Sequence, residues 1–173
     1  MPSIASLIVL DGEGKRLAAK YYDPAWRDFH KQVEFERAIF QKTNLSSTSQ
    51  ELDVLVLEQH LVVYRSSIDF QVYAVASKHE NEVIVAAVLQ ALFGALSSLT
   101  NGLMEKHTLL EHFDECMLVF DELVDGGFIL ETDPDVVCHR VAMLDSPTEL
   151  GSTDHPLSQA FASAKEISRN LLR

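Results

Sequence analysis

The clearest fold signal in the chain lies in residues 52–76, LDVLVLEQHLVVYRSSIDFQVYAVA. Three short runs within this stretch carry apolar side chains at alternate or consecutive positions, a pattern typical of strands. The joints between the runs, at Glu58-Gln59 and at Ser66-Ser67, are too short to hold a helix. Strands joined so closely run antiparallel. The stretch therefore predicts a three-stranded antiparallel meander.

Residues 83–104, which follow the meander, contain no charged side chain. An apolar run of this length would suit a membrane-spanning helix. A stripe of polar or small side chains nevertheless recurs through it at helical spacing: Gln90, Gly94, Ser97, Ser98 and Asn101. Acidic Glu80 and Glu82 stand before the run, where a membrane span would have basic anchors. Both features favour a buried core helix over a membrane span.

The residues before the meander predict two strands and a helix. Residues 3–10 are nearly all apolar, as in a strand that is covered on both faces. Turn-forming residues 11–14 connect this strand to a second one at residues 17–21. The apolar spacing then changes to a helical period over residues 26–42. A Ser/Thr-rich loop at residues 44–50 leads into the meander.

A further amphipathic helix is expected over residues 108–124, with one apolar and one acidic face. Gly126-Gly127 follows it, and we expect Gly126 to end this helix in the left-handed conformation. Asp133 as an N-cap and Pro134 at the first helical position predict the start of another helix.

The predicted order is ββ-α-βββ-α-α followed by two further helices, which defines an α+β fold. One five-stranded, largely antiparallel sheet would carry one helix on one face and two on the other. We expect this domain to occupy residues 1–145. Residues 146–156, rich in Pro, Gly, Ser and Thr, would form a surface linker, and residues 157–173 a C-terminal amphipathic helix.

The composition narrows the class of protein. The chain has 173 residues, 47% of them hydrophobic, which is enough to bury a core. Its formal net charge of −12 argues against general nucleic-acid binding, which depends on cationic side chains. Two cysteines cannot form a disulfide framework, and the N-terminal residues do not match a secretion signal. We therefore expect a reducing, cytoplasmic compartment.

The acidic charge is concentrated in one part of the chain. Between Lys106 and Arg140 there is no Lys or Arg, while Asp and Glu recur throughout. Such a run is either a solvated helix face with its turns or a patch that faces a basic partner.

The sequence contains no recognisable catalytic or metal-binding motif. His107 and His112 are five residues apart, a spacing that does not place two ligands on one helical face. Cys116 falls on the apolar face of its helix, and Cys138 is not part of a C-x-x-C motif. We therefore expect neither enzymatic activity nor a cofactor nor a metal ion.

The front of the chain holds more aromatic side chains than one small sheet consumes: Tyr21, Tyr22, Trp26, Phe29 and Phe40. Some of them would fill the core, and the rest would be available to a partner, because aromatic side chains are favoured at interfaces. The candidate partner-interface residues are Tyr21, Tyr22, Trp26, Phe29 and Arg65. From the residues alone, the chain is interpreted as an acidic, non-enzymatic α+β binding module.

Five segments are more distinctive than this general pattern: residues 19–23 (AKYYD), 35–43 (FERAIFQKT), 62–69 (VVYRSSID), 121–134 (DELVDGGFILETDP) and 163–173. Together they resemble the zeta subunits of coatomer, within the clathrin-adaptor small-chain family, whose members share a longin-like fold. The resemblance covers nearly the whole chain, and residues 121–134 are its most specific part. Residues 23–34 match only loosely.

Clathrin-adaptor sigma chains share the D-E-x-x-x-G-G-x-x-x-E frame of residues 121–131. Ile129-Leu130 and Asp133-Pro134 favour the zeta interpretation over the sigma one. A sigma-type small chain of a clathrin adaptor complex is therefore the alternative. A longin domain that regulates membrane fusion would need a SNARE heptad segment, for which the residues after the domain are too few.

The resemblance implies a vesicle-coat subunit that pairs with the solenoid trunk of the coatomer gamma subunit and so joins the heptameric coatomer. An Arf-family GTPase would recruit that coat to Golgi membranes, where it serves retrograde Golgi-to-ER and intra-Golgi vesicle transport. The implied location is cytoplasmic, peripheral on the cytosolic face of Golgi membranes and COPI-coated vesicles. Neither nucleic-acid binding nor a transmembrane segment of its own is implied.

Overall fold

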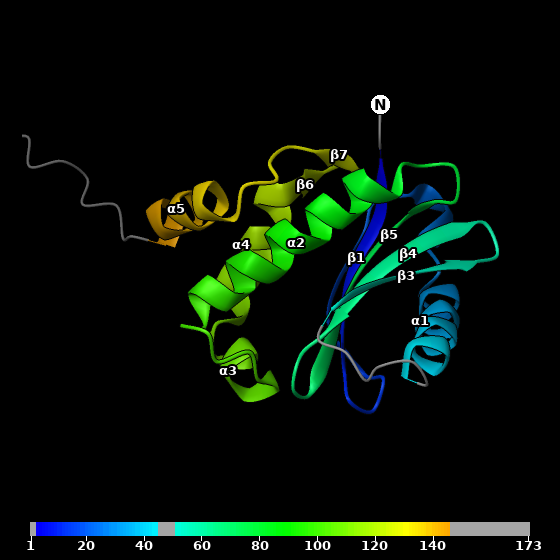
Figure 1. Ribbon diagram of the computed structural model, residues 1–173, viewed down its shortest axis with the longest axis horizontal. Coiled ribbons are helices and arrows are strands. Elements are labelled where there is room, and N and C mark those ends of the chain that lie inside the picture. The colour runs from blue at the N-terminus through cyan, green and yellow to red at the C-terminus, as the bar shows by residue number, and fades with distance from the viewer. Residues whose placement is uncertain (1–2, 45–50, 146–173) are drawn as a thin grey trace, which may run out of the picture. The chain divides into compact units, whose positions relative to one another are not determined.

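A five-stranded antiparallel sheet is the central layer of the computed structural model, which describes residues 3–44 and 51–145 (Figure 1). Its strands are β1 (Ile4–Asp11), β2 (Arg16–Tyr21), β3 (Leu52–Leu57), β4 (His60–Ser66) and β5 (Phe70–Ser77). They lie in the order β2-β1-β5-β4-β3, and each neighbouring pair is antiparallel. The predicted meander is confirmed as β3–β4–β5, and β1 and β2 form the predicted hairpin.

β1 lies between β2 and β5 and is covered on both faces, as its apolar run predicts. Leu7 and Val9 belong to the hydrophobic cluster on one face of the sheet, and Ile8 and Leu10 belong to the cluster on the other. All four side chains are at most 1% exposed. Because successive side chains of a strand point to opposite faces, this one strand supports both halves of the core.

Helices cover both faces of the sheet (Figure 1). α1 (Phe29–Asn44) covers one face and buries Phe35 and Ile39 there. α2 (Glu82–Leu99) and α4 (Phe113–Leu123) cover the other face and pack against each other. One helix on one face and two on the other is the predicted α+β arrangement.

The first helix begins later than predicted. Trp26 lies in a short 3-10 turn, η1 (Pro24–Trp26), which the carboxylate of Asp23 caps. A second aspartate, Asp28, accepts the backbone N–H of His30 at 2.9 Å where α1 starts. The prediction of one helix from residue 26 is wrong because each short acidic side chain initiates its own turn.

α2 is the apolar helix expected within residues 83–104. Its buried side chains share one face: Val85, Val88, Leu89, Ala91, Leu92, Ala95 and Leu96. Within the described residues it is the one helix long and apolar enough to cross a membrane. Its buried face packs on β4, β5 and α4, as the core-helix interpretation predicts. It ends at Leu99, earlier than predicted, because Asn101 and Gly102 have φ values of 51° and 80°.

The second amphipathic helix is broken in two, contrary to the prediction of one continuous helix. α3 (Lys106–Glu111) and α4 are separated at His112, which has φ −105° and ψ 31°. The Lys106 backbone N–H donates to the Asp69 carboxylate at 2.8 Å, and its ammonium lies 2.8 Å from the Asp11 carboxylate. The break lets α3 reach these two carboxylates at the turns of the sheet while α4 stays packed on α2.

Gly126 and Gly127 form the turn of a small hairpin rather than a helix cap. β6 (Val124–Asp125) pairs with β7 (Phe128–Ile129), and α4 ends before β6 begins. The two glycines have φ values of 54° and 90°, as a two-residue type I′ turn requires. The left-handed conformation expected for Gly126 is thus confirmed in a different structural role. The N–H of Ile4 donates to the Gly127 carbonyl at 2.8 Å and ties the hairpin to β1.

α5 (Pro134–Asp145) begins where Asp133 and Pro134 predict a helix start. The Asp133 carboxylate accepts the backbone N–H two residues further on at 2.9 Å, which is the geometry of an N-cap. The linker expected at residues 146–156 and the helix expected at residues 157–173 lie outside the described residues. The division into these parts therefore stays a prediction.

Candidate partner-binding surface

The candidate interface residues Tyr21 and Tyr22 lie where β2, an edge strand, ends. They belong to opposite faces: Tyr21 packs with the cluster under α1, and Tyr22 with the cluster under α2. The Tyr21 hydroxyl and the Arg16 Nε both donate to Glu36 Oε1 at 2.8 Å. Burial, followed by the charge of Glu36, raises the pKa of Tyr21, so its hydroxyl stays a neutral donor.

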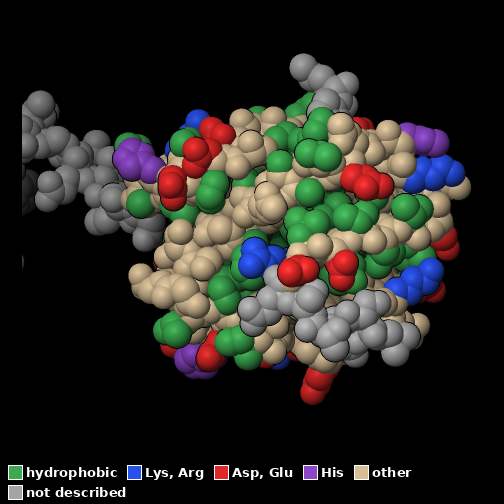
Figure 2. All heavy atoms as spheres, viewed as in Figure 1, with side chains coloured by type: hydrophobic (Ala, Val, Ile, Leu, Met, Phe, Trp, Pro, Cys, Tyr) green, Lys and Arg blue, Asp and Glu red, His purple; other side chains and the backbone are tan. Residues whose placement is uncertain are grey.

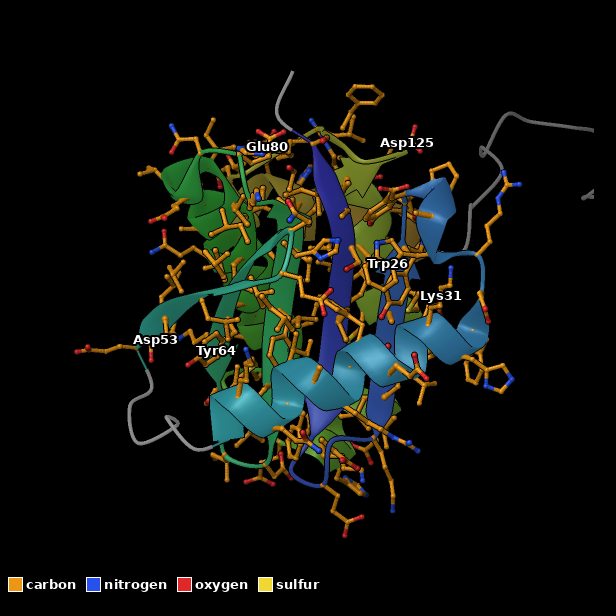
Figure 3. All side chains as sticks on the ribbon, turned by 90° about the vertical axis from the view of Figure 1, so that its right-hand side faces the viewer. Trp26, Lys31, Asp53, Tyr64, Glu80 and Asp125 are labelled. Carbon is orange, nitrogen blue, oxygen red and sulfur yellow. The ribbon has the colours of Figure 1, made fainter. Side chains whose placement is uncertain are left out.

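The Trp26 side chain packs against aromatic rings from three different elements. Its ring centroid lies 5.6 Å from that of Tyr21, 4.7 Å from that of Phe35 and 5.2 Å from that of His60. Figure 3 shows Trp26 on the β2 side of the sheet, above α1. The ring is half-buried. Trp26 therefore belongs partly to the core and partly to the surface.

Phe29, in contrast, is a surface residue, with 62% of its area exposed. The guanidinium carbon of Arg16 lies 5.1 Å from the centroid of its ring. Phe29, Arg16 and Phe40 line a groove of 600 Å³ between the β1–β2 hairpin and α1. An exposed aromatic ring held by a cation at the rim of a groove is typical of an interface anchor.

Tyr22 lies beside a different hollow, a pocket of 420 Å³ near the β6–β7 hairpin. A Cβ atom on Gly127 would lie 3.5 Å from the Tyr22 Cβ, so the hairpin approaches this side chain closely. Burial raises the pKa of Tyr22, and the nearby carboxylates of Asp121 and Asp125 raise it further. The Tyr22 hydroxyl therefore stays protonated in an acidic surrounding.

Arg65 is placed apart from the four aromatic residues. It belongs to β4, which β1 and β5 separate from β2. Its guanidinium carbon lies 4.0 Å from the centroid of the Phe93 ring of α2, on the face opposite α1. The structure thus brings Tyr21 and Trp26 into ring contact and connects Phe29 to Tyr21 through the Arg16 guanidinium. It places Tyr22 on the opposite face of the sheet and leaves Arg65 apart from all four.

A second exposed apolar area was not anticipated from the sequence. Figure 2 shows hydrophobic side chains on the surface where α2 approaches β4 and β3. Val54 and Val56 of β3 are 40% and 57% exposed, and Val83 of α2 is 74% exposed. The alternating pattern of β3 predicts which side chains share a face, but it carries no signal for how far α2 extends over that face.

The acidic segment around α4 is partly neutralised by cations from other elements. Lys20 of β2 forms an ion pair with Asp121. Arg140 of α5 lies 3.5 Å from Glu122 and 3.6 Å from Glu131. These pairs connect β2, α4 and α5. Internal ion pairing is therefore a third role for the acidic segment, beside the solvated helix face and the patch for a basic partner that its sequence allows.

The cysteine and histidine side chains, the residue types that could bind a metal ion or act as nucleophiles, occupy positions typical of structural residues. No group of three or more His, Cys, Asp or Glu side chains in the described residues is arranged to hold a metal ion. Cys116 is 2% exposed, and burial raises the pKa of its thiol to about 12. Burial also raises the pKa of the Cys138 thiol. His107 Nδ1 lies 3.6 Å from the Glu111 carboxylate of its own helix, and His112 Nδ1, between α3 and α4, lies 3.5 Å from the Glu115 carboxylate of α4.

The fold and this surface define a small sheet-and-helix domain with exposed and half-buried aromatic side chains near the end of β2 and the start of α1. The clathrin adaptor complex small chain family model matches residues 3–148, and the chain belongs to that family. It is 42% identical to coatomer subunit zeta-1 of Homo sapiens, over 99% of this chain and 94% of the relative. It is 36% identical to coatomer subunit zeta-2 of Arabidopsis thaliana, over 99% of this chain and 96% of the relative.

A solved-structure comparison agrees on the fold. The chain matches a chain of "Homology model of the full-length AP-3 complex in a stretched open conformation" with a TM-score of 0.66. The match covers 84% of this chain and 95% of the other at 16% sequence identity, so it supports the fold alone. Together with the coatomer zeta relatives, these findings confirm the family resemblance and favour the zeta interpretation over the sigma alternative.

Two residues that contact this aromatic group, His60 and Glu36, could not be identified from the sequence. His60 contacts Trp26 because the β3–β4 turn and η1 lie at the same end of the sheet. Glu36 is 4% exposed although it reads as a surface residue of an amphipathic helix. Neither has a local sequence signal, because each depends on a partner that is distant along the chain.

Proposed function

We propose that the chain is a non-enzymatic structural subunit, the zeta-type small chain of a coatomer (COPI) vesicle coat. The observation that carries this proposal is the 42% identity to a coatomer zeta subunit over 99% of the chain. Its relatives are coat subunits by name, and the exposed aromatic surface suits a subunit that works by binding.

The proposed direct partner is the solenoid trunk of the coatomer gamma subunit. We assign the contact to the β2–η1 surface, defined as Tyr21, Tyr22, Trp26 and Phe29. Its support is the exposure of Phe29 beside the guanidinium of Arg16. A specific contact of this kind buries about 1,200 Å² or more in total. Arg65 is proposed as a separate, secondary contact.

Through gamma, the chain would join the heptameric coatomer, which an Arf-family GTPase brings to the membrane. The proposed site of action is the cytosolic face of Golgi membranes and COPI-coated vesicles. The proposed process is retrograde Golgi-to-ER and intra-Golgi transport.

Affinity capture on the tagged chain from cytosol tests this function. A coatomer zeta subunit retains gamma and the rest of coatomer, whereas a sigma chain retains the large chain of a clathrin adaptor. Capture of the adaptor chain, or the absence of gamma, would refute the proposal.

A pair of phenylalanine variants then locates the contact. Phe29 and Phe113 are each the first residue of a helix, with 62% and 39% of their area exposed. Phe29→Ala should weaken gamma binding about tenfold or more, as expected for a hot-spot aromatic. Phe113→Ala should bind as the wild type does. Equal effects of the two substitutions would place the contact elsewhere.

A further inference from the structure

β3 forms one edge of the sheet, and its outer side has no neighbouring strand among the described residues (Figure 1). A tight turn joins it to β4, with Leu57 opposite His60. The residues that flank such a turn exchange backbone hydrogen bonds, and every second pair along the hairpin does the same. The backbone N–H and C=O groups of Leu52, Val54 and Val56 therefore point outward, away from β4. An edge of this kind can bind a further strand through its backbone.

The β3 edge lacks the features that protect the other edge of the sheet. Edge strands commonly avoid pairing by means of basic side chains, proline or a β-bulge. β2 carries Arg16 and Lys20, and its pairing with β1 shifts register between Val9 and Leu10. β3 has the sequence LDVLVL, without Lys, Arg or Pro, and its pairing with β4 has no register shift. β3 is therefore the edge at which a strand can be added.

The side chains along this edge are mostly apolar, and two of them are exposed. Val54 and Val56 are 40% and 57% exposed, on the face of the sheet that α2 covers (Figure 2). Leu55 lies on the other face, and so does Asp53, the one charged side chain of β3, whose carboxylate lies 3.4 Å from the Tyr64 hydroxyl oxygen. A strand added at this edge would therefore cover two exposed valines and meet a single carboxylate.

β3 is complementary to itself when two copies run antiparallel with Leu55 at the centre. Val54 then lies opposite Val56 of the second copy, and Asp53 lies opposite Leu57. Each of these pairs joins residues of the same face, as a continuous sheet requires. The outward backbone groups of the valines also face each other in this register, so they can exchange hydrogen bonds.

The charges near the edge agree with this register. Glu58 of one copy lies opposite Leu52 of the other, and Arg65 is the β4 residue paired with Leu52. Two strand spacings, about 10 Å, separate the backbones of Glu58 and Arg65, a distance that their long side chains can span. Glu51 and Asp53, the nearest carboxylates to this glutamate, follow the alternation of the strand onto the other face. The net charge of −12 on each copy is screened beyond about 10 Å at 0.1 M salt, so the local arrangement decides.

We propose that two copies of this chain pair through β3, so that their sheets join into one continuous antiparallel sheet about a two-fold axis. The edge calls for an extended apolar strand, and β3 itself is such a strand with a self-complementary register. The contact lies at the opposite edge of the sheet from β2, so it leaves the β2–η1 surface free. The pairing goes beyond the proposed coat function and does not depend on it.

Sedimentation velocity of the full chain over a range of concentrations measures the pairing. The wild type should show a reversible monomer–dimer equilibrium. Val54→Lys places an ammonium group at the contact in both copies and should weaken the dimer about tenfold or more. Val136→Lys is the matched control, because Val136 of α5 is 37% exposed and Val54 is 40% exposed. This control variant should dimerise as the wild type does.

Hydrogen exchange of the wild-type chain identifies the strand that makes the contact. Raising the protein concentration should slow the exchange of the Leu52, Val54 and Val56 amides, whose N–H groups point outward. The amides of Asp53 and Leu55, which point toward β4, should not change. This alternation is specific to an added strand, and its measurement needs no variant.

A wild-type chain that stays monomeric at every concentration would overturn the proposal, as would equal losses for Val54→Lys and Val136→Lys. Slowed exchange in β2 instead of β3 would place the contact at the other edge and overturn it too. If the Val54 and Val56 amides are protected only in a complex with the gamma trunk, the edge binds another polypeptide and the assignment to a second copy is wrong.

Discussion

Replacing Gly127 by alanine should destabilise the fold much more than replacing its neighbour Gly126 by asparagine. Gly127 has φ 90°, and a Cβ atom there would lie 3.0 Å from the carbonyl oxygen of Ile4. That distance is tighter than almost any ordinary Cβ contact, so the hairpin or β1 must shift. Gly126 has φ 54° with open space around its Cβ position.

The magnitude follows from two losses. A non-glycine residue in the left-handed region costs roughly 1–2 kcal/mol. Moving the hairpin away from Ile4 would also weaken the hydrogen bond from the Ile4 N–H to the Gly127 carbonyl, worth about 1 kcal/mol. The expected loss in the free energy of unfolding for Gly127→Ala is therefore about 2–3 kcal/mol. For a chain of this size, this lowers the melting temperature by roughly 4–12 °C.

The assay is thermal and urea unfolding of the full chain, followed by circular dichroism. Gly126→Asn is the control, because Asn-Gly is the favoured pair of a type I′ turn, and it should change stability by less than about 0.5 kcal/mol. Equal stabilities for the two variants would refute the reasoning from backbone conformation. A large loss for Gly126→Asn would show that the turn is not of this type.

Three further outcomes are expected. Burial alone would raise the pKa of the Asp11 carboxyl, but hydrogen bonds from Lys106 and from two backbone N–H groups lower this pKa below its ordinary value of 3.8. The ionised form of Asp11 should therefore stabilise the fold above pH 3.8. The stability difference between wild type and Asp11→Asn should thus be full at pH 5–7 and fall away as the pH drops below about 3.8, as measured by urea unfolding at each pH. Glu36→Ala should cost about 1–3 kcal/mol in chemical unfolding, because it leaves Arg16 and the Tyr21 hydroxyl without their shared acceptor. An acidic dileucine peptide should show no micromolar binding to the chain by calorimetry. The reason is that Arg65, the one Lys or Arg of residues 52–76, already lies against the Phe93 ring. Micromolar binding that is lost in Arg65→Gln would contradict this prediction.

The sheet could be predicted from the sequence because the residue patterns and turns that determine it are local. Residues 52–76 alternate or cluster their apolar side chains, and turns of a few residues leave only antiparallel pairing. The start of α5 at Asp133-Pro134 was predictable for the same reason, since the cap and the proline act within one turn. Elements set by neighbouring residues were therefore recovered at nearly the correct positions.

The breaks in the helices could not be predicted because they depend on distant residues. The break at His112 lets Lys106 meet Asp69 and Asp11, which belong to turns of the sheet far away in sequence. Helical periodicity continues through the break, so the pattern alone predicts one helix. The hairpin at Gly126 was similarly misassigned, since a glycine pair after a helix is equally consistent with a helix cap.

The candidate surface stays a prediction, but the structure shows what the sequence could not resolve within it. The sequence names the aromatic residues at the front of the chain together and does not separate Trp26, held by three rings, from exposed Phe29. That separation depends on His60, which reaches Trp26 across the end of the sheet. Burial of an individual aromatic side chain is thus a tertiary property that periodicity does not encode.

Residues 121–134, which carry the most specific family resemblance, also build one wall of the pocket near the β6–β7 hairpin. Gly127 fixes the N-terminal strand through its carbonyl, while Asp125 adds negative charge beside the pocket. A substitution that alters the turn therefore disturbs the fold at this end of the sheet, so its effect on binding cannot be separated from its effect on folding. A substitution that removes only the charge, such as Asp125→Asn, leaves the turn glycines and the hydrogen bond to Ile4 in place. Loss of partner binding in Asp125→Asn at unchanged stability would thus assign this segment a binding role in addition to its structural one.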